Sequence, residues 1–157
     1  MTPSIASEAY TRTKEDGLLK WVFQDELLTF PQFLEYFTTP TNFPVLVFDK
    51  DMFAGYAWLN GLEGKRGFGH FCFFKRAWGE TLRLGNAVLD YWFAMPSGSE
   101  FIIHVIVGST PTDNSLALRY NRKLGFEQIG VIPYMDHGKP CMISFKTREM
   151  HYGRKKS

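Results

Sequence analysis

The chain has 157 residues, of which 45% are hydrophobic and 22% are charged, and its formal net charge is only +2. This length and apolar content predict one domain with a substantial core, and the small, dispersed charge argues against nucleic acid as a partner. The sequence contains neither an 18-residue apolar run nor a signal-peptide pattern, so we expect a cytoplasmic protein without membrane contact.

The first third of the chain predicts two helices before any secure strand. Residues 1–12 are polar and fit either a first edge strand or a loose segment. Residues 14–23 carry apolar side chains at helical spacing, and a second helix is expected from Thr29 through Phe37, with Pro31 near its first turn.

Three strands in an antiparallel meander should follow. Residues 45–48 and 53–59 read as a hairpin around the polar turn 49–51. A Gly-rich turn over residues 60–67 then leads into a short aromatic strand at 70–74, His-Phe-Cys-Phe-Phe.

A connection rich in basic residues joins that strand to a helix expected over residues 80–94. Gly79 in this connection permits backbone conformations that other residues resist, and the first turn of a helix leaves N–H groups without intrahelical partners. With the charges of Lys75 and Arg76 these donors fit a phosphate-binding turn. The same residues also fit an ordinary strand-to-helix connection with two solvated basic side chains.

The second half alternates strands and helices. The continuous apolar run 101–107 predicts a strand covered on both faces and parallel to the strand at 70–74. A helix over residues 113–124 should be capped by Asp113 or Asn114 and ended by Gly125, and strands at 126–134 and 141–146 should close the sheet.

Two motifs occur in a fixed order: Arg76-x-x-Gly79-x-Thr81 before the first of these helices, and Asn114-x-x-Ala117 with Lys123-Leu124-Gly125-Phe126 around the second. With this order of elements, residues 43–145 resemble the GCN5-related N-acetyltransferases. The resemblance implies an α/β (α+β) fold with a mixed, largely antiparallel sheet of six to seven strands, helices on both faces, and a central parallel strand pair splayed for acyl-CoA.

The resemblance further implies acetyl-CoA as co-substrate and an unidentified amine acceptor. The pantetheine arm would lie against residues 73–75 and the pyrophosphate would meet the N–H groups of residues 77–82. The cofactor-binding residues expected on this basis are Phe73, Phe74, Lys75, Arg76, Ala77, Trp78, Gly79, Glu80, Thr81, Asn114 and Asn121.

Two positions depart from the family pattern. Thr81 stands where the family has Gly or Ala, and its side chain could either crowd or hydrogen-bond the pyrophosphate. The position of the family's general-acid Tyr is occupied by Asn121, and Tyr120 is one residue out of register, which on a helix turns it by about 100°. Tyr120 is therefore either the general acid or a packing residue.

Candidates for the general base are His70 and His104, on the two strands expected to flank the gap, because imidazole titrates near neutrality. Each also fits a satisfied core histidine. Glu63 is a third candidate, or a solvated turn carboxylate. The resemblance also implies that the early helices border the acceptor, which singles out five of their aromatic residues: Trp21, Phe30, Phe33, Tyr36 and Phe37.

We therefore expect a single N-acetyltransferase domain over residues 1–150, followed by a basic tail over 151–157. The alternative is a module that keeps this fold and binds partners without turnover. Nucleic-acid binding would rest only on Arg154, Lys155 and Lys156, which we expect to form a solvated end. No metal site is expected, Cys72 and Cys141 should be buried free thiols, and a homodimer through the last strands is possible.

Overall fold

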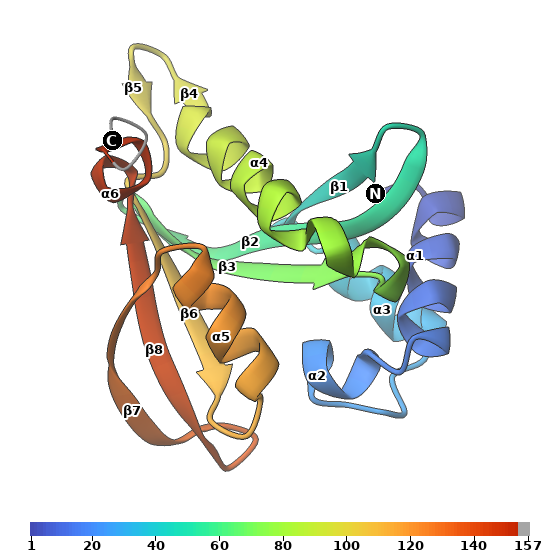
Figure 1. Ribbon diagram of the computed structural model, residues 1–157. Helices are drawn as coiled ribbons and strands as arrows, with labels where there is room; N and C mark the ends of the chain where they lie inside the picture. Colours follow the sequence, from blue (N-terminus) through green and yellow to red (C-terminus); the bar gives the residue numbers. More distant parts are fainter. Residues whose placement is uncertain (154–157) are drawn as a thin grey trace.

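A computed structural model describes residues 1–153 and shows a mixed six-stranded sheet in the order β1-β2-β3-β6-β8-β7, with a separate two-stranded hairpin β4-β5 (Figure 1). The predicted α+β architecture is therefore confirmed, with six main strands. The helices are α1 Pro3–Glu15, α2 Leu19–Phe23, α3 Phe30–Thr38, η1 Lys75–Glu80 (a 3₁₀ helix), α4 Thr81–Ala94, α5 Ser115–Lys123 and α6 Arg148–Gly153. The strands are β1 Phe43–Asp49, β2 Met52–Glu63, β3 Arg66–Phe73, β4 Pro96–Ser97, β5 Glu100–Phe101, β6 Val105–Pro111, β7 Glu127–Asp136 and β8 Lys139–Thr147.

The N-terminus is a helix, and the expectation of an edge strand or a loose segment there is wrong. The Thr2 hydroxyl caps α1 by accepting the N–H of Ile5 at 3.5 Å, and Pro3 occupies the first turn, where a missing N–H costs nothing. The buried side of α1 consists of the small residues Ala6, Ala9 and Thr13. A stripe of small residues gives a weak hydrophobic pattern, which is why the sequence did not indicate this helix.

The helix expected over residues 14–23 is divided in two. Gly17 has a φ of +68°, in the left-handed region that glycine favours, and it separates α1 from the short α2. After the break, α2 lies beside the end of β3 (Figure 1).

The predicted meander is confirmed, since β1 pairs with β2 and β2 pairs with β3, both antiparallel. The predicted parallel partner of β3 is also present, but it begins at Val105 instead of residue 101. Phe101 belongs to the small β5 strand, and the parallel ladder joins only residues 66–68 to residues 105–107.

Beyond Phe68 the two parallel strands separate. Figure 1 shows β6 and β8 turning away from β2 and β3, with α2 and α5 on the two sides of the opening. On the side of β3 away from β2, the ladder gives residues 69–73 no partner strand among the described elements. The gap implied by the family resemblance is therefore part of this fold.

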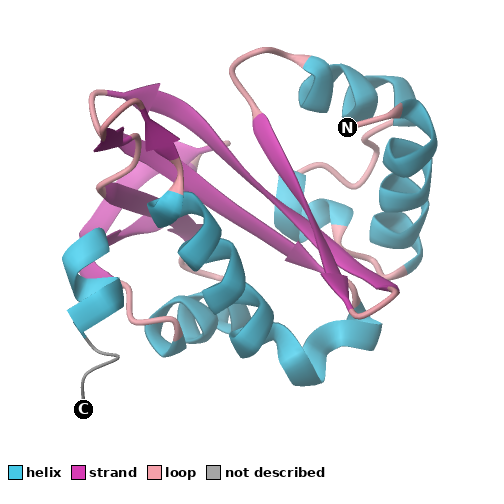
Figure 2. Cartoon of the chain, turned by 90° about the horizontal axis from the view of Figure 1, so that it is seen from above, coloured by secondary structure: helices cyan, strands magenta, loops and turns pink. Residues whose placement is uncertain are grey.

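Two buried clusters fill the two faces of the sheet, and Figure 2 shows helices on both sides. One cluster centres on Trp92, Phe93 and Ile106 under α4. The other is almost entirely aromatic and packs α1 and α3 onto β2 and β3 through Phe33, Phe37, Tyr56, Trp58 and Phe74.

The C-terminal elements bear on two expectations. The helix α6 runs across the boundary expected after residue 150, and His151 is buried 2.8 Å from an Asp90 oxygen. Arg154, Lys155 and Lys156 of the expected basic tail lie outside the described residues. The dimer through the last strands stays a prediction; β7 is an edge strand that exposes Ile129, Val131, Ile132, Tyr134 and Met135.

Candidate functional site

A cavity of about 740 Å³, here the larger cavity, opens where β3 and β6 separate. Its walls come from the end of β3, the 3₁₀ turn η1, the first residue of α4, the start of α5 and the α1–α2 connection. The predicted cofactor residues that line it are Phe73, Lys75, Trp78, Thr81 and Asn114. Asp16, Gly17, Leu18, Trp21, Val22, Leu116 and Ala117 also line it and were not among those predicted.

The turn between β3 and α4 already binds an anion. The backbone N–H of Lys75 donates to the Asp16 carboxylate at 2.7 Å, across 59 residues of sequence. Within residues 1–153 no side-chain hydrogen bond caps the N-terminus of α4, which follows η1 directly, so no side-chain cap offsets the positive end of its dipole. A phosphate group placed here would meet the same kind of donor that now holds Asp16.

The side chains of this turn divide into those that face the larger cavity and those that do not. The indole N–H of Trp78 donates to the Phe73 carbonyl at 3.0 Å, so this backbone acceptor at the end of β3 already has a hydrogen-bond partner. The Thr81 hydroxyl donates to the Trp78 carbonyl at 3.3 Å. The Arg76 guanidinium instead donates to the Phe53 carbonyl, toward β2, so its charge is not directed into the larger cavity.

Other predicted cofactor residues do not line the larger cavity. Phe74 and Ala77 are buried in the core, and Glu80 is exposed and bonded to Arg83. Gly79 also differs from the expectation, because its φ is not positive. Nothing in the protein lies within 4 Å of the position that a Cβ would occupy there, so no described residue requires glycine at this position.

The second motif forms the opposite wall. Asn114 caps α5 by accepting the Ala117 N–H at 3.1 Å, as predicted, and it lines both cavities. Gly125 has a φ of +83° and ends the helix region as predicted. Asn121 faces away from the larger cavity, and its amide donates to the Thr110 hydroxyl at 3.0 Å.

Tyr120 lies between the two motifs. Its hydroxyl donates to the Thr81 carbonyl at 2.9 Å, and its ring packs edge-on against Phe71 and Phe73. Burial raises the pKa of Tyr120 above its ordinary value, so the phenol stays protonated and is a weaker proton donor than a free one. These contacts join α5 to the start of α4.

A second cavity of about 470 Å³, here the smaller cavity, adjoins the larger one. Six residues line both cavities and mark where they meet: Trp21, Val22, Phe71, Asn114, Ala117 and Tyr120. Of the five aromatic residues expected to border an acceptor, Trp21 and Tyr36 line the smaller cavity. Phe30, Phe33 and Phe37 do not, and Phe33 and Phe37 are buried in the core.

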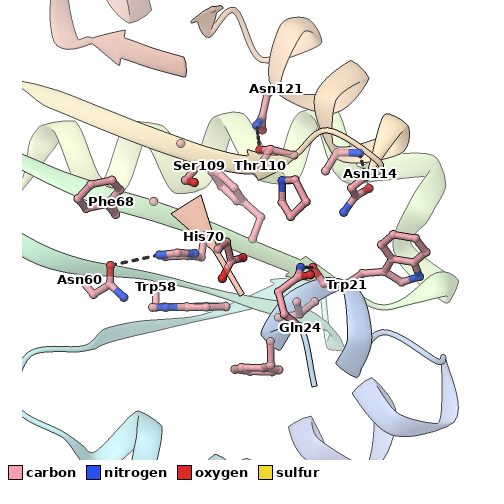
Figure 3. Close-up of a pocket in the computed structure, with 18 of the residues that line it drawn as sticks. Trp21, Gln24, Trp58, Asn60, Phe68, His70, Ser109, Thr110, Asn114 and Asn121 are labelled. Carbon is pink, nitrogen blue, oxygen red and sulfur yellow. Dashed lines mark hydrogen bonds between the residues drawn. The ribbon is translucent and has the colours of Figure 1, made fainter. Parts of the chain in front are cut away.

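His70 lies on one wall of the smaller cavity within a fixed polar network. Figure 3 shows its ring over Trp58 and its Nε2 joined to Asn60. The His70 and Trp58 rings stack with centroids 4.6 Å apart, and Nε2 lies 3.2 Å from Asn60 Oδ1. The Asn60 amide N–H donates to the Tyr36 hydroxyl at 3.2 Å, as does the Trp58 indole N–H at 3.1 Å.

This network sets the tautomer of His70. Because Asn60 Oδ1 can only accept, Nε2 of His70 carries the hydrogen, and Nδ1 keeps its lone pair. Burial lowers the pKa of His70 to about 4, so the ring is neutral at neutral pH.

The other two base candidates lie elsewhere. The expectation that His104 flanks the gap is wrong, because it precedes β6 at the paired end, where its N–H donates to the Lys65 carbonyl at 2.7 Å. Glu63 is an exposed turn residue that pairs with Arg66. Neither residue lines either cavity.

Two further findings concern chemistry outside the cavities. Cys72 and Cys141 are buried and free, and burial raises the pKa of Cys72 to about 12. Within residues 1–153 no cluster of three His, Cys, Asp or Glu side chains is arranged to hold a metal ion. No helix in this part of the chain is both long and apolar enough to cross a membrane.

Comparison with known proteins gives matches only at the level of structure. No family model matches the chain, and no curated protein matches it. Aminoglycoside acetyltransferase AAC(6')-Ib in complex with ribostamycin and coenzyme A superposes with a TM-score of 0.81 at 17% identity, covering 100% of this chain and 95% of that one. The spermidine N-acetyltransferase from Vibrio cholerae in complex with CoA and spermine has a TM-score of 0.78 at 12% identity, covering 97% of this chain and 95% of that one.

These neighbours have the fold of the GCN5-related N-acetyltransferases. The chain thus has the fold that its two motifs predicted. At these identities the likeness concerns the fold alone.

Proposed function

We propose that the protein transfers the acetyl group of acetyl-CoA to a primary amine. The observation that carries the proposal is the larger cavity at the open edge of β3, next to a helix start whose neighbouring N–H already binds a carboxylate. Structural neighbours over the whole chain are acetyltransferases in complex with CoA or acetyl-CoA, which supports the same assignment.

In this proposal the pantetheine arm lies along the unpaired edge of β3, as an added strand would, and the pyrophosphate meets the N-terminus of α4. Of the predicted cofactor residues, Lys75, Trp78 and Thr81 then border the cofactor. The thioester comes to the junction of the two cavities, beside Phe71 and Tyr120.

The acceptor amine enters through the smaller cavity. Its nitrogen lone pair forms the new C–N bond, the C–S bond breaks, and the electron pair stays on sulfur. The nitrogen loses one proton and the sulfur ends as a thiol. His70 is kept neutral with a free Nδ1 lone pair, so it can accept a hydrogen bond from the amine and orient it.

No freely placed general acid is needed for this step. Tyr120 donates to the Thr81 carbonyl and its pKa is raised, so we assign it a positioning role. Both cavities open to solvent, and the thiolate can take its proton from water.

Calorimetric titration with CoA and acetyl-CoA tests the proposal, comparing the wild type with Gly79→Arg. We expect micromolar binding to the wild type and loss of binding in the variant, because Gly79 lies two residues before the start of α4, where we propose that the pyrophosphate binds, and a long side chain there would crowd it. Gly130→Arg is the matched control, since Gly130 likewise lacks a positive φ and has no atom near its Cβ position. A wild type that neither binds nor slowly hydrolyses acetyl-CoA rules the proposal out.

A second candidate is a module that binds CoA without turnover, and the engaged hydroxyl of Tyr120 favours it. Binding of CoA without transfer to any amine in a broad panel would support this candidate. Tyr120→Phe separates the roles of this residue. A fall in kcat of about a hundredfold or more indicates a general acid, and a small fall indicates positioning.

A further inference from the structure

We infer that the smaller cavity accepts an arylalkylamine, a primary amine on a short chain that ends in an aromatic ring. The inference rests on the proposed acetyl transfer and names the class of acceptor for the same site.

The charge of the cavity walls limits the acceptor. Among the described residues that line the smaller cavity, Asp136 supplies the only carboxylate, and there is no lysine or arginine. The remaining polar groups are amides and hydroxyls, such as those of Gln24, Asn60 and Ser109, and the imidazoles of His70 and His137. His137 lies 3.6 Å from the Asp136 carboxylate. A polyamine or an aminoglycoside brings several further ammonium groups, each of which needs an anionic partner when it leaves water. One carboxylate suits an amine with one charge.

One side of the wall is a packed group of aromatic rings around Trp58. Phe23 stacks on Trp58 with an interplanar angle of 7°, and His70 stacks on Trp58 at the same angle. Tyr36 meets Trp58 edge-on and holds its indole N–H. These rings are fixed by the protein before any ligand binds, so a flat apolar group that lies against them loses little freedom in the walls.

Trp21 is the aromatic residue best placed to contact such a ligand. It is 43% exposed, although it is among the largest apolar side chains, and it lines both cavities. A ring in the smaller cavity would cover part of that exposed surface. Its amine would then lie at the junction, where the thioester is expected.

Asp136 can attract the ammonium form of the amine to the smaller cavity. Its side chain is 35% exposed at the β7–β8 turn, where solvent still reaches it. It can therefore attract the ammonium from water. The nitrogen must then lose a proton before or during attack, and the proton leaves to solvent.

The test compares three acceptors with the full chain and saturating acetyl-CoA: 2-phenylethylamine, n-butylamine without the ring, and spermidine with additional charges. We expect kcat/KM for 2-phenylethylamine to exceed that for n-butylamine by about tenfold or more, since the ring buries apolar surface, and to exceed that for spermidine as well. Equal values for the two monoamines, or a higher value for spermidine, would overturn the inference.

A variant tests whether the ring of the acceptor binds in the smaller cavity. Trp21→Ala should reduce the preference for 2-phenylethylamine over n-butylamine severalfold. Tyr91→Ala removes another exposed aromatic side chain, outside both cavities, and should leave the preference unchanged. Because the readout is a ratio of two substrates, a general loss of activity in Trp21→Ala does not produce the expected result. An unchanged ratio in Trp21→Ala counts against the inference.

Calorimetry separates this inference from the proposed function. If the wild type binds CoA but the CoA-saturated protein does not bind 2-phenylethylamine, the acceptor class is wrong and the cofactor assignment stands. If CoA itself does not bind, both fail.

Discussion

The two cavities are built in different ways, although they share a junction. The larger one is formed by the ends of regular elements, where β3 loses its partner and α4 and α5 begin, and its anion-binding feature is a backbone N–H. The smaller one is formed by side chains from α2, α3, β2, β3, β6, α5 and the β7–β8 turn. Backbone geometry therefore defines the cavity proposed for the cofactor, whereas individual side chains define the cavity proposed for the acceptor.

Behind the end of β3, which lines the larger cavity, the backbones of β2 and β3 approach closely, and disturbing this approach should have the largest effect. At Gly55, on β2 opposite Phe73, an added Cβ would lie 2.2 Å from the Cys72 carbonyl oxygen. We expect Gly55→Ala to lower the free energy of unfolding by about 3 kcal/mol or more, because a backbone atom in a sheet cannot move aside. Urea unfolding of the wild type and the variant measures this difference in the free energy of unfolding.

Gly64→Ala is the control for this prediction. Gly64 has a φ of +59°, but nothing lies within 4 Å of its Cβ position, so only the backbone conformation is strained, at about 1 kcal/mol. Equal losses for the two variants would mean that the approach at Gly55 is not the constraint.

The polar network of the smaller cavity should appear in the pH dependence of stability. The pKa of His70 is lowered to about 4 in the folded protein, against about 6.5 in the unfolded chain. Between these values the unfolded state binds one more proton, so stability is complete above pH 6.5 and is lost as the pH falls toward 4. The shift allows at most about 3 kcal/mol, and the partial exposure of the ring reduces the expected loss to about 2 kcal/mol.

Unfolding of His70→Gln over the same pH range checks this prediction, because the variant should lose that part of the pH dependence. His137→Gln, whose side chain is 67% exposed on the same cavity, should retain it. Persistence of the full slope in His70→Gln would show that another group titrates.

The difference between the cavities also explains what could be predicted from sequence. The elements around the larger cavity follow from contiguous patterns, such as the cap at Asn114 and the left-handed Gly125, so the fold and the elements that form this cavity could be predicted. The loop from α1 could not, because the contact of Asp16 with Lys75 joins residues 59 positions apart. His104 was misplaced because an apolar run indicates a strand without indicating where its pairing starts.

The smaller cavity has no local signature. Asn60 and Asp136 were missed because an amide in a strand and a carboxylate at a turn are ordinary surface residues in a sequence. Trp21 and Tyr36 were expected to border the acceptor only through the family resemblance. The hydrogen bonds that join Tyr36, Asn60 and His70 exist only in the folded protein, where α3, β2 and β3 lie side by side.

A tight contact behind the larger cavity should give a moderate effect. In α4, a Cβ on Gly85 would lie 1.9 Å from the Tyr120 hydroxyl. We expect Gly85→Ala to cost about 1–2 kcal/mol, because the clash outweighs the better helix propensity of alanine. Tyr120→Phe should cost about 1 kcal/mol by removing the hydrogen bond to the Thr81 carbonyl.

The double variant then measures whether these two residues meet. Since Tyr120→Phe removes the atom that clashes, the double variant should be more stable than the sum of the single changes implies, by about 1 kcal/mol. Combining Gly85→Ala with Tyr91→Phe, on the exposed face of the same helix, should instead be additive.

The smallest expected effect concerns charge in the larger cavity. CoA is a polyanion, and Asp16 places a carboxylate on the N–H of Lys75, where we propose that the phosphates bind. Asp16→Asn keeps a hydrogen-bond acceptor and removes the charge, so CoA should bind about two- to fivefold more tightly, with a smaller gain at high salt. Calorimetry at two salt concentrations measures this, with Asp51→Asn in the exposed β1–β2 turn as the control for net charge. Weaker binding to Asp16→Asn would mean that the carboxylate supports the turn that receives the phosphates, and that the α1–α2 connection belongs to the cofactor site as much as β3 does.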